Sequence, residues 1–256
     1  MLSEAKHPFR RTPGESRIPR SARNDKRAIH FQDPMLLLAA NTSGKDGSIA
    51  LAKCGPGDVC EIIEVVPLAG GTFSAQLVPQ IAELLLKHQL GKKDIEGFAV
   101  ASGPGSFTGL RVGLAAVKAL AEVLRKPIAE ISLLEAMASE SGLRGTVMAA
   151  LDAGRNELYV GEYDVQECAT PLNQSLLTRE EFLASVRGYI VTPDASLADA
   201  ARNAGLPVKE IPRPRSDTIA QLGWKKILAG DTVSPEVLDA NYIRRSDAEI
   251  FSKGSS

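Results

Sequence analysis

The stretch whose residue types best suit ligand chemistry runs from Ser102 to Gly113 and is rich in glycine, serine and threonine. A loop of this composition between a strand and a helix leaves backbone N–H groups free at the start of the helix, where they can hold an anion such as phosphate. Its spacing differs from two known phosphate loops. Leu110 stands where a Walker loop has lysine, and Thr108 stands where a dinucleotide-binding loop has its third glycine. The alternative interpretation is a tight turn whose glycines permit positive φ or close packing.

A second polar group, Asp152, Arg155 and Glu157, could supply an acid–base pair and a guanidinium to a cleft. The same residues together with Gly154 are typical of a hairpin turn, and we favour that interpretation. After residue 34 the only histidine is His88, so neither a Ser–His–Asp nor a Cys–His nucleophile system can be assembled there. We therefore expect no catalytic residue in this chain.

The composition describes a globular protein with an aliphatic core. Of 256 residues, 44% are hydrophobic, 24% charged and 5% aromatic, which excludes a disordered or collagen-like chain. The formal net charge of −1 provides no overall basic field for nucleic acid. Three cysteines without a Cys-x-x-Cys pair fit a reducing compartment, and no apolar run reaches the roughly 20 residues that cross a bilayer. We expect a cytoplasmic protein that does not enter a membrane.

The first 34 residues differ from the rest of the chain. They contain eight lysines and arginines against four acids, together with four prolines, and they lack a sustained apolar period. We expect this leader, 1–34, to be disordered, because it cannot bury enough surface to offset its ordering entropy. One interpretation is a basic arm that touches RNA. We favour a mis-called start codon, with translation beginning at Met35, where the globular pattern begins.

The elements that would position these residues follow in the same order twice. The first series has strands at 36–40, 48–53 and 61–66, a helix at 74–89, a strand at 97–101, a helix at 110–125 and a strand at 128–131. The second begins with a hairpin of strands at 146–151 and 157–165 and continues with helices and strands to residue 229. This doubled pattern predicts two similarly built α/β lobes, 35–145 and 146–256, with a ligand cleft between them.

Several motifs, in their order along the chain, resemble those of the bacterial TsaB (YeaZ) family. The central one runs from Gly103 to Arg111, and the stretches 36–43, 132–136, 151–159 and 241–244 support it. The resemblance covers about residues 35–251. It implies the two-lobed fold of the actin, sugar-kinase and Hsp70 superfamily (the ASKHA fold), in which each lobe is a mixed sheet with flanking helices. The motif-loop residues that it singles out are Gly103, Gly105, Ser106, Phe107, Thr108 and Gly109.

The resemblance also implies that the nucleotide chemistry of the superfamily is lost. Active members use an aspartate in the first hairpin to help hold magnesium and water around ATP. Here Asn41 takes that place in a degenerate nucleotide loop, Asn41-Thr42-Ser43, and a neutral amide lacks the charge that a hard cation favours. TsaD-like relatives carry a His-x-x-x-His metal pair, which His7, His30 and His88 cannot form. We therefore expect neither a cofactor nor a bound metal.

The family role that the resemblance implies is that of a non-catalytic partner of TsaD. The pair adds threonylcarbamoyl to adenosine beside the anticodon of tRNAs that read codons beginning with A. The family binds TsaD through helices of the N-terminal lobe, or binds a second copy when TsaD is absent. The ATPase TsaE joins the pair, and contact with tRNA is indirect. The residues expected at this interface are Phe73, Ser74, Leu77, Arg111, Val112, Ala115, Ala116 and Ala119.

Departures from the family pattern keep alternatives open. Phe73 and Ser74 begin a segment where the family commonly has His-Ser-Glu. Ser74 is a predicted N-cap, with Phe73 as the hydrophobic residue before it. One alternative function is an ATP-dependent kinase or acyltransferase of the same superfamily. Another is a stand-alone homodimer with a separate role.

Overall fold

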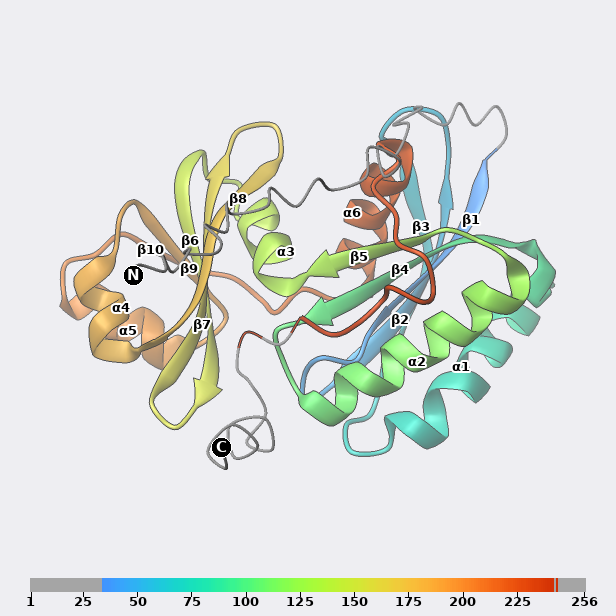
Figure 1. The fold of residues 1–256 in the computed structure, drawn as a ribbon, viewed down its shortest axis with the longest axis horizontal. Coiled ribbons are helices and arrows are strands. Elements are labelled where there is room, and N and C mark those ends of the chain that lie inside the picture. The colour runs from blue at the N-terminus through green and yellow to red at the C-terminus, as the bar shows by residue number, and fades with distance from the viewer. Residues whose placement is uncertain (1–33, 242, 244–256) are drawn as a thin grey trace, which may run out of the picture.

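Two β-sheets, each with helices on its faces, make up the protein in a computed structural model that describes residues 34–241 and 243. Helices α3 and α6 lie between the two sheets (Figure 1). The predictions made for the leader fall almost entirely on residues 1–33, outside the described residues. The same holds for Tyr242 and Arg244 of the closing motif.

The first sheet is mixed and has the strand order β3-β2-β1-β4-β5. Its strands are β1 (Met35–Asn41), β2 (Gly47–Cys54), β3 (Cys60–Leu68), β4 (Ile95–Gly103) and β5 (Ile128–Ser132), and the short 3-10 helix η2 (Lys92–Asp94) precedes β4. Along β1, Leu38 and Ala40 face α1 (Phe73–Lys87) and α2 (Phe107–Leu124), whereas Leu37 and Ala39 face α6 (Ser216–Leu228). Burial on both faces explains the continuous apolar run of this strand.

The second sheet repeats the topology of the first. Its strands are β6 (Gly145–Gly154), β7 (Glu157–Val165), β8 (Ala169–Thr178), β9 (Tyr189–Thr192) and β10 (Val208–Glu210). Their order, β8-β7-β6-β9-β10, places the first strand of the lobe at the centre of the sheet, as in the first sheet, with the hairpin strands on one side and the parallel strands on the other. Helices α4 (Arg179–Ser185) and α5 (Ala195–Asn203) cover one face, and α3 (Leu133–Glu140) covers the other. The expectation of two similarly built α/β lobes is confirmed.

Helix α6 packs on the first sheet although it follows the second sheet in sequence. Its Ile219, Trp224 and Ile227 are buried in a cluster that also contains side chains of α3 and of both sheets. The indole Nε1 of Trp224 donates a hydrogen bond to the carbonyl oxygen of Gly57, at 3.0 Å, in the β2–β3 turn. The two sheets are formed by the residues before and after the start of β6 at Gly145. Helix α6 comes from the later residues but packs on the first sheet, so one continuous core joins the lobes.

Two local predictions are wrong, and the sequence patterns do not predict strand β8. Helix α1 begins at Phe73 with Thr72 as its N-cap, so Ser74 does not cap it. The Phe73 ring is buried and leaves no room for a side chain at Gly47, where a Cβ would lie 2.8 Å from the ring. Helix α2 begins at 107 rather than 110, because the Ser106 hydroxyl accepts a hydrogen bond from the backbone N–H of residue 109. Strand β8 is an edge strand with little buried surface, and its sequence lacks a clear apolar alternation.

Candidate functional site

The central motif loop and the turn after β1 pack directly against each other. The backbone N–H of Ser106 donates to the carbonyl oxygen of Ser43 at 2.7 Å, and the Thr42 hydroxyl donates to the carbonyl oxygen of Gly109 at 2.7 Å. Both Thr42 and Ser43 are buried. The start of α2, where an anion could have been held, therefore lies against this chain's own backbone.

The glycines of the motif make this close packing possible. A Cβ at Gly105 would lie 2.3 Å from the carbonyl oxygen of Ser43, and one at Gly109 would lie 2.1 Å from that of Thr42. Gly103 has a φ of +123°, which only glycine adopts without strain. These positions support the tight-turn interpretation of the loop rather than that of an anion cradle.

Asn41 uses both ends of its buried amide within the protein. Its Nδ2 donates to the carbonyl oxygen of Pro214 at 2.9 Å, and its Oδ1 accepts from the backbone N–H of Ser43 at 3.0 Å and from the Ser43 hydroxyl at 2.6 Å. An aspartate could not donate to the Pro214 carbonyl. The residue that would hold nucleotide-bound magnesium in this fold is thus an uncharged link between the first hairpin and the segment before α6, and the residues present do not fit that ion.

A cleft of about 720 Å³ lies beside this turn. Three cationic side chains line it, Lys45, Arg213 and Arg215, against the single carboxylate of Asp46. Partial burial lowers the pKa of the Arg213 guanidinium, and the nearby carboxylate of Asp152 opposes that shift. This excess of positive charge disfavours a divalent cation.

The residues from Asp152 to Glu157 form a turn, in agreement with the favoured interpretation. The Asp152 carboxylate accepts a hydrogen bond from the backbone N–H of Gly154 at 2.9 Å, and Arg155 and Asn156 both have positive φ. Asn156 also donates to the Glu180 carboxylate at 3.0 Å. The Asp152 bond closes the β6–β7 turn, and the Asn156 bond ties that turn to α4.

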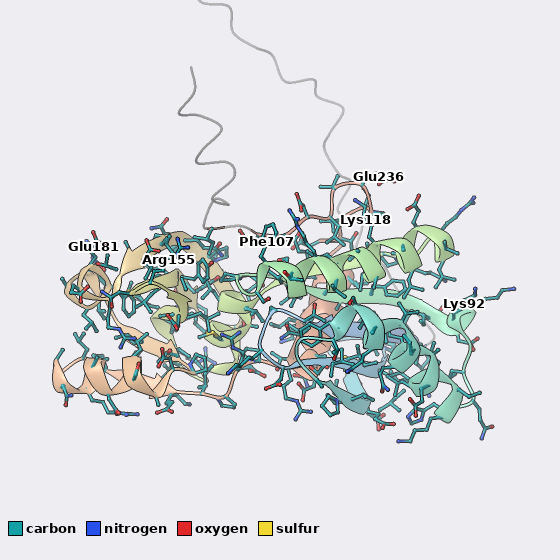
Figure 2. The ribbon with its side chains drawn as sticks, turned by 90° about the horizontal axis from the view of Figure 1, so that it is seen from below. Lys92, Phe107, Lys118, Arg155, Glu181 and Glu236 are labelled. Atoms are coloured by element: carbon teal, nitrogen blue, oxygen red, sulfur yellow. The ribbon has the colours of Figure 1, made fainter. Side chains whose placement is uncertain are left out.

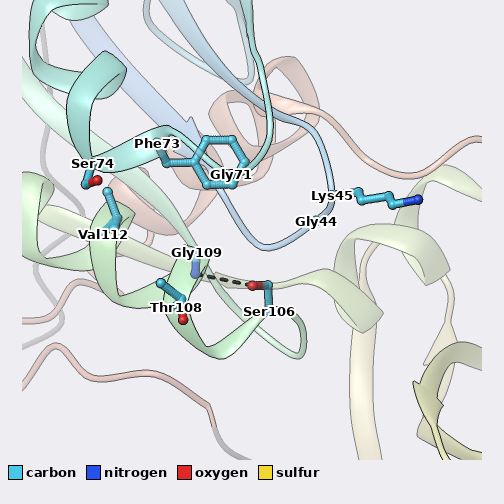
Figure 3. A pocket seen from close by; sticks show the side chains of 9 residues that line it. All are labelled: Gly44, Lys45, Gly71, Phe73, Ser74, Ser106, Thr108, Gly109 and Val112. Carbon is cyan, nitrogen blue, oxygen red and sulfur yellow. Dashed lines mark hydrogen bonds between the residues drawn. The ribbon is translucent and has the colours of Figure 1, made fainter.

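A groove of about 370 Å³ brings the motif loop and the expected interface residues together (Figure 3). Ser74 and Phe73 line it from the start of α1, Val112 from α2, and Lys45 from the β1–β2 turn. Also in its lining are Gly44, Gly71, Ser106, Thr108 and Gly109.

The expected interface residues divide between the core and the surface. Phe73 and Leu77 are 7% and 1% exposed and belong to the core beneath α1 and α2. Val112 and Ala116 are half-buried at the edge of that core. On the surface are Ser74, Arg111, Ala115 and Ala119.

The outer faces of α1 and α2 carry apolar residues that the sequence reasoning missed. Val78 and Leu86 on α1 are 57% and 76% exposed, and Val123 on α2 is 74% exposed. Phe107, 42% exposed, begins the outer stripe of α2, and the Arg111 guanidinium lies 3.8 Å from its ring centroid. The sequence could have indicated these residues, because on each helix they recur every four residues and form a line beside the buried apolar face.

The segment after α6 borders this surface on one side. Leu238 is buried in the same core, and the backbone N–H of Asn241 donates to the carbonyl oxygen of Ser102 at 2.8 Å. Figure 2 shows Glu236 of this segment near Lys118 of α2, with Phe107 at the start of the helix. Hydrogen bonding, first from Ser234, holds the pKa of the exposed Glu236 carboxyl below its usual value, and Lys118 adds to this effect.

Within residues 34–241 and 243, no group of three or more His, Cys, Asp or Glu side chains could hold a metal ion. Nor is any helix in that part of the chain long and apolar enough to cross a membrane.

The duplicated sheet topology defines an actin-like two-lobed α/β protein, which confirms the expected ASKHA fold. A family model described as "TsaD: tRNA N6-adenosine threonylcarbamoyltransferase" matches residues 65–183. The solved structure of YeaZ from Pseudomonas aeruginosa aligns with a TM-score of 0.66 and 22% identity over 80% of this chain and 99% of that one, a likeness in fold.

Proteins named "tRNA threonylcarbamoyladenosine biosynthesis protein TsaB" match the chain as well. That of Haemophilus influenzae is 37% identical over 131 residues, covering 50% of this chain and 53% of that protein. That of Escherichia coli is 26% identical over 228 residues, covering 84% of this chain and 96% of that protein. The matched region spans about half the length of the first relative and nearly all of the second. The chain is a homologue of the TsaB (YeaZ) proteins, and the resemblance carried by its motifs is confirmed.

Proposed function

We propose that this chain takes part in the biosynthesis of threonylcarbamoyladenosine in tRNA, as a non-catalytic subunit that binds TsaD. The single observation that carries the proposal is the state of Asn41, whose amide is buried and committed to Pro214 and Ser43. The names of its relatives supply the pathway. The reaction itself, transfer of threonylcarbamoyl to adenosine beside the anticodon, belongs to TsaD in this proposal.

The outer faces of α1 and α2 support the assignment of a docking surface. On α1 the exposed positions 74, 78, 82 and 86 follow at four-residue spacing, and on α2 the exposed positions 107, 111, 115, 119 and 123 do the same. Small side chains at Ala115 and Ala119 allow a partner helix to approach closely, and Val78, Leu86 and Val123 supply apolar contact area. Scattered apolar residues are common on protein surfaces, so the argument rests on their alignment along two neighbouring helices.

TsaD is the proposed occupant, and a second copy of this chain takes its place when TsaD is absent. TsaE joins the pair, and contact with tRNA is made through the partners. The contribution of this chain is to favour the competent conformation of TsaD, which requires only that it bind that conformation more tightly than the others. Phe73 and Leu77 are 7% and 1% exposed, so they contribute little area to the proposed contact, although Phe73 borders the groove beside it.

Binding to TsaD from the same organism tests the proposal. The full chain and TsaD are mixed, and complex formation is measured by size-exclusion chromatography and calorimetry. Val78→Glu and Val123→Glu each place a carboxylate on the proposed contact, and we expect each to weaken binding about 100-fold or more, because an unpaired charge in an interface costs several kcal/mol. Positions 112 and 116 are less suitable, since a glutamate at a half-buried site also disturbs the core.

Leu172→Glu is the matched control, because Leu172 is 56% exposed on β8 of the other lobe. It should bind TsaD like the unmodified chain. If Val78→Glu and Val123→Glu bind TsaD as tightly as Leu172→Glu, the interface does not include the outer faces of α1 and α2. If the unmodified chain does not bind TsaD, the proposal is contradicted. Micromolar binding of Mg–ATP with turnover by the isolated chain would favour the kinase or acyltransferase alternative. A homodimer that TsaD never displaces would favour the stand-alone role.

A further inference from the structure

Two cysteines face each other at the end of the β2–β3 hairpin, in a region that the proposed function does not use. Cys54 and Cys60 are directly opposite in the antiparallel ladder, and their sulfur atoms lie 2.8 Å apart. The backbone N–H of Gly55 donates to the carbonyl oxygen of Val59 at 2.8 Å. Because hydrogen-bonded and non-hydrogen-bonded pairs alternate, the cysteines occupy a non-hydrogen-bonded position, where opposite Cα atoms are about 4.5 Å apart. That separation lies within the range of disulfides.

The two thiols differ in exposure and in acidity. Cys54 is fully buried, whereas Cys60 is half-buried and lines a cavity of about 660 Å³ between the lobes. A hydrogen bond from the Cys54 thiol lowers the pKa of Cys60, and burial opposes that shift less strongly. Cys60 is therefore the group from which a thiolate can attack a small molecule in the cavity, and Cys54 is placed to resolve the product.

We propose that Cys54 and Cys60 form a reversible dithiol–disulfide pair that exchanges with low-molecular-weight disulfides such as oxidised glutathione. The Cys60 thiolate attacks one sulfur of the small disulfide, whose S–S bond breaks and releases one thiolate. Cys54 then loses its proton and attacks Cys60 Sγ, and the second small thiolate leaves. The protein pair is oxidised by two electrons, one small disulfide is reduced to two thiols, and the two protons from the cysteines end on those thiols.

The β2–β3 turn couples this pair to the helix between the lobes. The carbonyl oxygen of Gly57 in that turn accepts the hydrogen bond of Trp224 Nε1, at 3.0 Å, and the Asp58 carboxylate lies 4.0 Å from Lys225 Nζ. Closing the hairpin with a disulfide changes the turn that both residues of α6 contact. Because Trp224 is the only tryptophan of the chain, its fluorescence reports the oxidation state of the pair.

The full chain carrying Cys168→Ser isolates the reaction, because Cys168 lines the same cavity and is the only other cysteine. The protein is equilibrated in glutathione buffers of increasing oxidised fraction, free thiols are alkylated, and the state of each cysteine is found from intact mass and peptide mapping. We expect both thiols to disappear together, with a mass loss of two hydrogen atoms, to return on addition of dithiothreitol, and to be tracked by Trp224 fluorescence.

Cys60→Ser in the same background is the control, and it should show no change of fluorescence in these buffers. Three results would overturn the proposal. They are free thiols in buffers that oxidise dithiothreitol, a glutathione adduct on Cys60 alone at equilibrium, and a disulfide between Cys60 and Cys168 in the unmodified chain. None of them depends on whether the chain binds TsaD, so the outcome is distinct from that of the proposed function.

Discussion

Replacing Asn41 by aspartate tests most directly whether the degenerate nucleotide turn has become structural. The substitution keeps an acceptor for Ser43 and removes the donor to the Pro214 carbonyl, 2.9 Å away. Asn41 is 5% exposed, so the carbonyl oxygen loses its partner out of contact with water. An unsatisfied buried acceptor costs about 1–3 kcal/mol. The desolvated carboxylate adds to this cost, and we expect a total of about 2–4 kcal/mol near pH 7.5.

The penalty of Asn41→Asp should depend on pH. Burial and the facing carbonyl raise the pKa of the introduced carboxyl above its unfolded value of about 3.9. Between that value and the raised pKa the native state binds more protons than the unfolded state, so stability falls as pH rises. Below this window the protonated carboxyl can donate to Pro214. The loss in free energy of unfolding caused by Asn41→Asp is therefore smallest at acid pH and reaches its full value above the raised pKa. Arg213 lies against the same turn and can offset part of it.

Urea unfolding followed by Trp224 fluorescence at pH 7.5 and pH 4.5 measures these effects. Asn41→Ala is the control, since it loses the same donor without adding a charge and should be destabilised without the additional pH dependence. If Asn41→Asp stays within about 0.5 kcal/mol of the unmodified chain at pH 7.5, the amide link to Pro214 is not structural. If Asn41→Asp binds Mg–ATP with micromolar affinity, a single substitution restores a nucleotide site. The conclusion that this turn has become purely structural is then wrong.

Two further substitutions test the packing of the same lobe and the ionisation of a carboxyl near α6. Gly109→Ala should cost about 2–3 kcal/mol in urea unfolding, because the added Cβ lies 2.1 Å from the Thr42 carbonyl oxygen. The control Gly91→Ala, whose nearest neighbour is 3.7 Å away, should be near neutral. Burial raises the pKa of Glu140, although a hydrogen bond from Thr218 opposes the shift, so its contribution to stability falls as pH rises from the unfolded value through the raised one. Glu140→Gln should remove that fall, and an unchanged pH dependence would contradict the shift.

Local patterns were sufficient to predict most of the fold. The alternation of apolar residues and the hairpin turns located the strands of both sheets except β8, because strands with one or two buried faces carry that signal directly. Strand β8 buries little surface, so its sequence does not need to alternate apolar and polar residues. The doubled order of elements predicted two similar lobes, but periodicity could not reveal that α6 packs on the first sheet.

The candidate site could be predicted only in part. The glycine loop was found from residue type and spacing, and Asn41 from the family resemblance, but the residues that contact them were not found. Pro214 is 173 residues from Asn41, and no local pattern encodes such a contact. The outer stripes of α1 and α2 were missed, because the expected interface residues were taken from the family resemblance and not from helical spacing. Phe73 and Leu77 were assigned to the partner on that resemblance, whereas the structure buries them in the core.

Three hydrogen bonds tie the segment around α6 to the first hairpin and its neighbours. Asn41 donates to Pro214, the backbone N–H of Ser216 donates to the Ser48 hydroxyl at 3.0 Å, and Trp224 donates to Gly57. All three bonds lie within the first lobe, because α6 packs on the first sheet. They hold the first lobe in one arrangement. A subunit that acts by docking benefits from this, because a rigid surface loses less conformational entropy when it binds. The amide of Asn41 thus stands in place of a metal ligand and helps to fix the lobe that carries the proposed docking surface.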